Sequence, residues 1–150
     1  MAQRDWTRGL TFDDAASYGR DRPRYPSEFL DDLAEVVGLD IGPRILEVGS
    51  GPGVAAEEMI ARGWSVLDVG PSEQLVRVAR EKFDASRSSV ETATLDEWSA
   101  NDRRFDAVFS ASASHWVAPQ IRWVKVAAVL DPGRVVALSG HENVADSDIE

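Results

Sequence analysis

Three glycines at alternate positions mark the part of this sequence best suited to hold a ligand. Gly49, Gly51 and Gly53 follow a β-prone run at 44–48 and precede a helix-prone run at 54–61. A strand, a tight turn and a helix N-terminus in this order leave backbone N–H groups pointing outward, with little side chain to block a ligand. The spacing therefore predicts a binding loop. A glycine-rich turn that only lets a strand enter a helix is the alternative.

The spacing of these glycines disfavours a nicotinamide-dependent oxidoreductase. A dinucleotide-binding fingerprint, G-x-G-x-x-G, would place its third glycine where this sequence has Val54. Such sites also use an acid near the end of the following strand, and Gly70 stands there instead.

Composition limits the classes of function. The 150 residues fit one domain with a sizeable core, and a formal net charge of −10 argues against a nucleic-acid partner. The sequence has no cysteine, and its two histidines, His115 and His141, are too far apart to be a metal-ligand pair, so we expect no metal site. No stretch looks like a signal peptide or a membrane span, and we expect a cytoplasmic protein without membrane association.

The elements that would position the loop follow from apolar periodicity and turn residues. Strands are expected at 44–48, 65–69, 90–93, 105–110 and 135–138. Helices are expected at 54–61, at 121–129 and after the N-cap residues Ser27 and Ser72. This alternation predicts an α/β fold: a Rossmann-like, doubly wound, mostly parallel sheet of about five strands with helices on both faces. We expect a single domain over 1–150, with an N-terminal arm at 1–26 and an acidic tail at 141–150.

Four further segments accompany the glycine loop and the acid two residues ahead of it, Glu47. They are Phe12-Asp13 with Tyr18, Arg22-Pro23 and Tyr25-Pro26; Phe105-Asp106-Ala107-Val108; Ser114-His115-Trp116; and Leu130-Asp131-Pro132-Gly133. In this order the five segments resemble the class I S-adenosylmethionine-dependent methyltransferases. The N-terminal segment that begins at Phe12 is similar to the leader of a small-molecule subgroup, and Ser114-His115-Trp116 is similar to the His-Trp motif of that subgroup. The resemblance covers nearly the whole chain, although Arg134 replaces the second glycine of the last motif.

The resemblance implies S-adenosylmethionine as the cofactor and a small molecule as the methyl acceptor. It places the backbone of the loop, with Ser50 between its glycines, under the methionine part of the cofactor. It places Glu47 near the cofactor's ammonium group. A carboxylate hydrogen-bonded to neighbouring loop amides is the equal alternative for Glu47.

The sequence departs from the family at the end of the second strand. The family has an acid there, seventeen residues after the last glycine, which binds the ribose hydroxyls, and this sequence has Gly70 before Pro71-Ser72. Asp68 would face the same side of the strand, about 6–7 Å back. It either reaches the ribose through water or is a partly buried acid with a local partner.

Other site residues follow from the same resemblance and from the ends of the strands. In the segment 94–98, Asp96 would accept from the adenine amine and Leu95 would pack on the ring. Thr94 in place of Asp96 and an acidic helix start are the alternatives. Past the fourth strand, Ser110, Ala111 and Ser112 would border the methyl group, because ligands of open α/β sheets lie beyond the carboxyl ends of the strands.

Two features of the arm and the fourth-strand loop could add to the site. His115 could act as a base or orienting group, although a structural histidine is the more common case. Tyr18, Arg22 and Tyr25 could form a lid over the cofactor, and surface packing of the arm is the alternative.

The family's sheet has seven strands, and this sequence stops soon after the fifth. The apolar run 135–138 would then be an exposed sheet edge, which favours a homodimer or higher oligomer. A catalytically impaired module that keeps the fold for binding is the alternative function, motivated by Gly70 and the missing strands.

Overall fold

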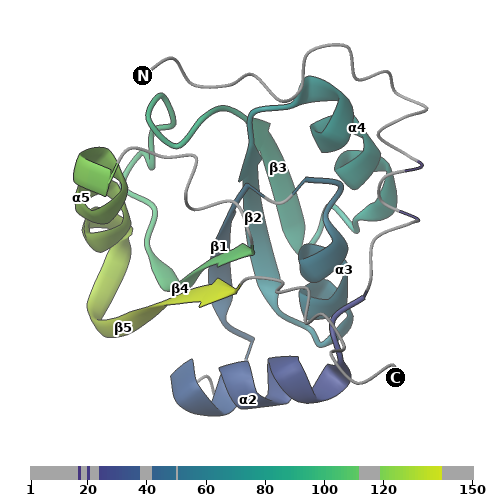
Figure 1. The fold of residues 1–150 in the computed structure, drawn as a ribbon, viewed down its shortest axis with the longest axis horizontal. Helices are drawn as coiled ribbons and strands as arrows, with labels where there is room; N and C mark the ends of the chain where they lie inside the picture. Colours follow the sequence, from purple (N-terminus) through teal and green to yellow (C-terminus); the bar gives the residue numbers. More distant parts are fainter. Residues whose placement is uncertain are drawn as a thin grey trace, which may run out of the picture.

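The computed structural model describes residues 17, 20, 24–37, 42–49, 51–111 and 119–139 (Figure 1). Within these ranges the chain forms one five-stranded parallel sheet in the order β3-β2-β1-β4-β5. The strands are β1 (Arg44–Val48), β2 (Ser65–Gly70), β3 (Ser88–Thr92), β4 (Phe105–Ala111) and β5 (Leu130–Ser139). The helices are α2 (Ser27–Val37), α3 (Val54–Ala61), α4 (Glu73–Lys82) and α5 (Pro119–Val129). The expected Rossmann-like α/β fold is confirmed.

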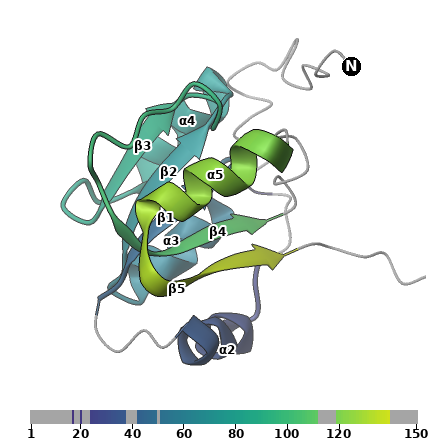
Figure 2. The ribbon, with the colours of Figure 1, turned by 90° about the vertical axis from the view of Figure 1, so that its left-hand side faces the viewer.

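Helices cover both faces of the sheet (Figure 2). On one face, α2 and α3 bury Leu30, Ala56 and Met59 against Ile45. On the other face, Val126 and Val129 of α5 pack with Leu46. Because side chains alternate along a strand, Glu47 shares the α3 side with Ile45, whereas Val48 shares the α5 side with Leu46.

Most boundaries lie within two residues of those expected. The hydroxyl of Ser72 accepts from the amide of Leu75 at 3.4 Å, as expected of an N-cap. Ser27 is instead the first residue of α2, and its hydroxyl donates to Glu28 at 3.2 Å. β3 begins at Ser88, two residues before the predicted start.

β5 differs most from the sequence prediction, because it begins at Leu130 rather than at residue 135. Phe105 pairs with Leu130 and Ala107 with Val135, so Asp131-Pro132-Gly133 forms a bulge inside the strand. Gly133 has a φ of 81° there, a left-handed conformation that suits glycine.

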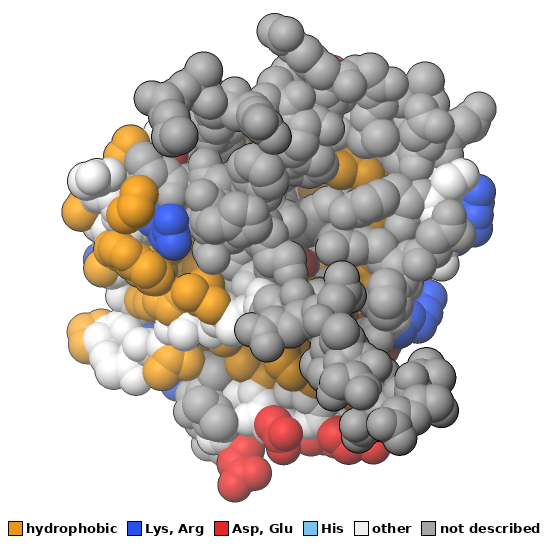
Figure 3. All heavy atoms as spheres, in the orientation of Figure 1, with side chains coloured by type: hydrophobic (Ala, Val, Ile, Leu, Met, Phe, Trp, Pro, Cys, Tyr) orange, Lys and Arg blue, Asp and Glu red, His pale blue; other side chains and the backbone are white. Residues whose placement is uncertain are grey.

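Apolar side chains are exposed beside β5. Within the described ranges β5 pairs with β4 alone, and Leu138 is 51% exposed. Trp123 and Val124 of α5 are 46% and 70% exposed. Figure 3 shows hydrophobic side chains gathered at the left, the side on which Figure 1 shows α5. None of the helices in the described part of the chain has the length and hydrophobicity of a membrane-spanning segment.

Candidate functional site

The strand order reverses between β1 and β4, and this point defines the candidate site. In open α/β sheets the crevice for a ligand opens beyond the carboxyl ends of the strands at such a point. The two ends are joined here, because the buried hydroxyl of Ser110 donates to the carbonyl of Val48 at 2.9 Å. The amide of Gly49 donates to the carbonyl of Val69 on β2 at 2.8 Å. The ends of three adjacent strands are therefore fixed relative to one another.

The three glycines all have left-handed backbones. Their φ angles are 73° at Gly49, 59° at Gly51 and 82° at Gly53, a region that other residues rarely adopt. At Gly53 a Cβ would also lie 2.3 Å from the ring of Phe83. The turn thus needs glycine at these positions for its own shape, whether or not its amides hold a ligand. Ser50 lies outside the described residues.

Glu47 and Asp68 form a buried pair of acids under this loop. They are direct neighbours in the β1–β2 ladder, face the α3 side and are 1% and 0% exposed. Burial is the main cause that raises the pKa of Glu47 well above its usual range, and the charge of Asp68 is the second. A hydrogen bond from the backbone amide of Ala56 to the Glu47 carboxylate acts in the opposite direction and lowers this pKa. The Oε2 atom of Glu47 accepts no hydrogen bond from a described residue. A positive charge close to this pair would stabilise its ionised carboxylates.

The donor to Glu47 lies in α3 rather than in the loop. Ala56 is the third residue of α3, so the carboxylate accepts one of the free amides at the start of that helix. The loop amides expected in the alternative for Glu47 are therefore not the donors found; a helix amide donates instead, next to an oxygen that remains without a described donor.

Gly70 ends β2 without a side chain to reach into the crevice. Its carbonyl accepts from the amide of Ala93 at 3.0 Å, which closes the ladder to β3. Asp68 lies two residues earlier, on the same side and fully buried against Glu47.

The segment after β3 forms a tight turn. The carbonyl of Thr94 accepts from the amides of Glu97 at 3.2 Å and Trp98 at 2.9 Å. Leu95 is 3% exposed and packs into the sheet core with Trp98. The Oδ1 atom of Asp96 is buried and accepts no hydrogen bond from the described part of the chain. A buried carboxylate oxygen of this kind suits the expected acceptor of an amine.

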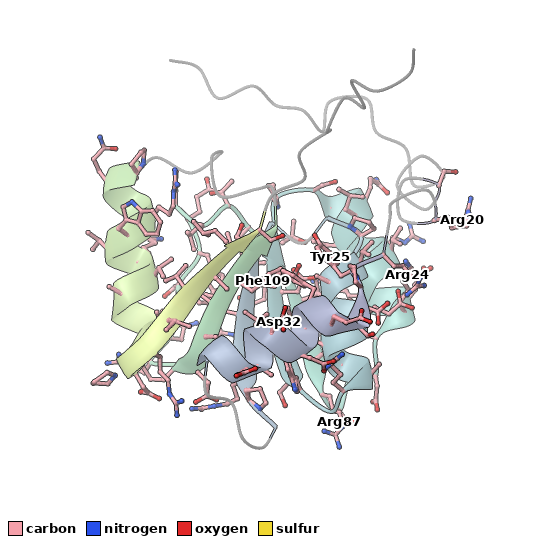
Figure 4. The ribbon with its side chains drawn as sticks, turned by 60° about the horizontal axis from the view of Figure 1, so that its bottom comes forward. Arg20, Arg24, Tyr25, Asp32, Arg87 and Phe109 are labelled. Atoms are coloured by element: carbon pink, nitrogen blue, oxygen red, sulfur yellow. The ribbon has the colours of Figure 1, made fainter. Side chains whose placement is uncertain are left out.

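The residues just before α2 are anchored near β4 and α3. Tyr25 stacks on Phe29 with ring centroids 5.3 Å apart, and it meets Phe109 of β4 edge-on at 6.4 Å (Figure 4). Arg24 pairs with Glu57 and Glu58 of α3 at 3.5 and 3.0 Å. The expected lid residues Tyr18 and Arg22 lie outside the described residues, as do Ser112, His115 and the side chain of Ala111.

A groove of about 630 Å³ lies at the opposite, amino-terminal edge of the sheet, where Arg44, Ser65 and Ser88 begin their strands. Acids already pair with two of its arginines: Asp106 lies 3.8 Å from Arg44, and Glu91 binds Arg103. The groove is far from the strand ends that bind ligands in this class of sheet. In the described part of the chain, no group of acids and histidines could hold a metal ion.

No sequence pattern predicted the roles of Lys125 and Arg103, which hold the turn after β3 through backbone carbonyls. Lys125 lies in a helix that was predicted from its apolar positions alone, so no role was predicted for its polar residues. No local pattern identifies a cation whose partners are carbonyls about 30 residues away.

Comparisons with known proteins agree with this geometry. The family described as "Methyltransferase domain" matches residues 45–133, more than half of the chain. An uncharacterized methyltransferase of Mycobacterium tuberculosis is 34% identical over 125 residues, which are 83% of this chain and 49% of that protein. A trans-aconitate 2-methyltransferase of Rhodopseudomonas palustris is 29% identical over 117 residues, 75% of this chain and 44% of that protein.

The fold has a solved counterpart in an S-adenosylmethionine-bound amino pentose methyltransferase from Micromonospora echinaspora. The TM-score is 0.68 at 20% identity, over 88% of this chain and 57% of that one. The chain spans about half the length of the relatives that it matches.

Proposed function

Because this chain belongs to the methyltransferase domain family, we propose that it carries out S-adenosylmethionine-dependent methyl transfer to a small-molecule acceptor. One observation carries the proposal. The glycine turn, the buried Glu47 and the end of β4 meet at the point where the strand order reverses. That is the position where this class of sheet binds its ligands.

The charge and hydrogen-bonding capacity of the residues fit the cofactor. S-adenosylmethionine supplies, when bound, a methyl group activated by a positively charged sulfur, and it also carries an ammonium group. The Glu47–Asp68 pair favours a cation, and Oδ1 of Asp96 is a buried acceptor for an adenine amine. The proposed cofactor residues are Tyr18, Arg22, Glu47, Gly49, Ser50, Gly51, Gly53, Asp68, Gly70, Leu95, Asp96, Ser110 and Ala111.

The chain's own part in the reaction is alignment. Methyl transfer needs an acceptor atom held in line with the activated methyl group, and orientation alone can supply much of the rate. Ser110 and Ala111 would border that group, and His115 is the proposed base or orienting residue. No catalytic triad is required.

Two observations support a small acceptor. The net charge of −10 disfavours a nucleic acid, and the trans-aconitate and amino pentose enzymes are named for small acceptors. The reported relatives are named as methyltransferases, which favours transfer over a module without activity. Gly70 predicts a cofactor affinity about ten- to a hundredfold weaker than an acid there would give.

Isothermal titration of the full chain with S-adenosylhomocysteine tests the cofactor proposal. We expect saturable 1:1 binding and a thermal shift, with no response to NAD. Absence of heat and of a thermal shift at millimolar ligand would refute the proposal.

We also propose a single cytoplasmic domain that self-associates through the β5 edge. Among the described residues β5 is paired on one side only, and this edge together with the exposed Trp123 and Leu138 supports that contact. Sedimentation at micromolar concentration should show a dimer or larger species. A 16.4 kDa monomer would contradict the assembly proposal alone.

A further inference from the structure

Lys125 of α5 holds three backbone carbonyls of the turn that follows β3. Its Nζ donates to the carbonyl of Leu95 at 2.8 Å, to that of Trp98 at 2.8 Å, and to that of Asp96. An ammonium group has three donors, so this lysine is saturated by one short segment. The partners lie about 30 residues away in sequence, on the connection between β3 and β4.

Arg103 continues the same arrangement toward β4. Its Nε donates to the carbonyl of Ala100 at 2.7 Å, and its Nη2 donates to that of Ser99 at 3.0 Å. Glu91 of β3 binds Arg103 and also accepts from the indole of Trp98 at 2.6 Å. Two cations therefore fix carbonyls at both ends of the turn, and Lys125 binds those that come first after β3 along the chain.

Fixing the carbonyl of Leu95 also fixes the amide of Asp96. The two groups belong to one planar trans peptide and point in opposite directions, so the amide of Asp96 points away from Lys125. No described residue accepts from that amide, and Oδ1 of the same residue is a buried acceptor without a described donor. A donor and an acceptor on one rigid residue can recognise a ring nitrogen and the exocyclic amine beside it.

We propose that Lys125 is a positioning residue for base recognition: it orients and polarises the Leu95–Asp96 peptide so that Asp96 distinguishes adenine from other bases. The inference rests on the proposed function, since it presumes an adenosyl ligand. A cation on a carbonyl strengthens the donor at the other end of the same peptide, because hydrogen bonds in a chain polarise one another. The charge of Lys125 thus acts on the ligand through the backbone.

The experiment compares S-adenosylhomocysteine with S-inosylhomocysteine, in which a carbonyl oxygen replaces the adenine amine. Titration of the wild-type chain should show at least a tenfold preference for the adenosyl ligand, because the inosyl base cannot satisfy the same acceptor. In Lys125→Met the preference should fall to within about twofold, with adenosyl affinity at least tenfold weaker. A purely structural lysine would lower the unfolding temperature and leave the ratio of the two affinities unchanged.

Arg80→Met is the matched control. Arg80 of α4 also holds a backbone carbonyl, that of Val90, at 2.8 and 3.2 Å, but in β3 rather than in the turn. This variant should keep the wild-type preference even if its stability falls.

Lys125→Arg keeps the test available if the methionine variant does not fold. A planar guanidinium cannot converge on three carbonyls as an ammonium does, so the preference should be intermediate. A wild-type preference in either Lys125 variant would overturn the inference and leave the proposed function standing. If the wild-type chain binds neither ligand, the proposed function and the inference about Lys125 are both refuted. If it binds the two ligands equally well, only the inference about Lys125 is refuted.

Discussion

Replacing Glu47 with glutamine should make the protein more stable at neutral pH. Glu47 is 1% exposed beside the fully buried Asp68, and burial, followed by that neighbouring charge, raises its pKa. Glutamine keeps an oxygen for the amide of Ala56 and removes the charge that must otherwise be desolvated.

The pH dependence fixes the sign and the scale of this effect. The folded chain holds the Glu47 proton more tightly than the unfolded chain, whose pKa is near 4.5. Between that pH and the raised folded pKa, unfolding releases a proton, so the stability that Glu47 contributes falls as pH rises. For one proton the slope approaches about 1.4 kcal/mol per pH unit. Above the folded pKa the difference between variant and wild type becomes constant.

Urea unfolding between pH 4.5 and 8, followed by the fluorescence of the buried Trp64 and Trp98, measures this difference. The gain from Glu47→Gln should grow with pH, and it should be smaller in an Asp68→Asn background, where the second cause is absent. Glu35→Gln, at an exposed position of α2, is the control for the glutamate-to-glutamine substitution itself. A Glu47→Gln variant with the same free energy difference from wild type at every pH would refute the reasoning.

Three further changes have defined outcomes. Gly53→Ala should lower the free energy of unfolding in urea by about 1–3 kcal/mol, because the residue has a φ of 82° and its Cβ would lie 2.3 Å from an aromatic ring. Gly133→Ala, with a φ of 81° and open space around its Cβ, should lower it by about 1 kcal/mol or less. Equal losses in the two variants would contradict the packing argument. Glu91→Gln should cost about 0.5–1 kcal/mol at pH 7, since Arg103 lowers the pKa of this part-exposed acid. That cost should vanish as pH falls below 4.5 and through the folded pKa; a gap independent of pH would count against the ion pair. Gly70→Asp should tighten S-adenosylhomocysteine binding about ten- to a hundredfold by titration, and an unchanged affinity would mean that another group already binds the ribose.

The fold was predictable because periodicity and turn chemistry agree along most of the chain. The run at 54–61 became α3 with the expected bounds, and Ser72 caps α4 through its hydroxyl. The start of β5 was not predictable, since a bulge around Gly133 depends on pairing with β4, a long-range contact.

The candidate site was predictable only where a local motif defines it. The spacing of the glycines predicted the tight turn, in which all three have positive φ angles. The burial of Asp68 against Glu47 was not predictable in this way, because it depends on the register of two strands. The role of Lys125 could not be predicted from the sequence, because its partners are backbone carbonyls, which every residue has.

Hydrogen exchange of the full chain with and without S-adenosylhomocysteine tests whether the cofactor binds in the crevice at the strand ends. We expect slower amide exchange at 47–53 and 94–98, around the ends of β1 and β3, and no change at 84–89 beside the groove at the amino-terminal edge. Protection confined to that groove, or no protection at saturating ligand, would contradict the assignment of the crevice as the cofactor site.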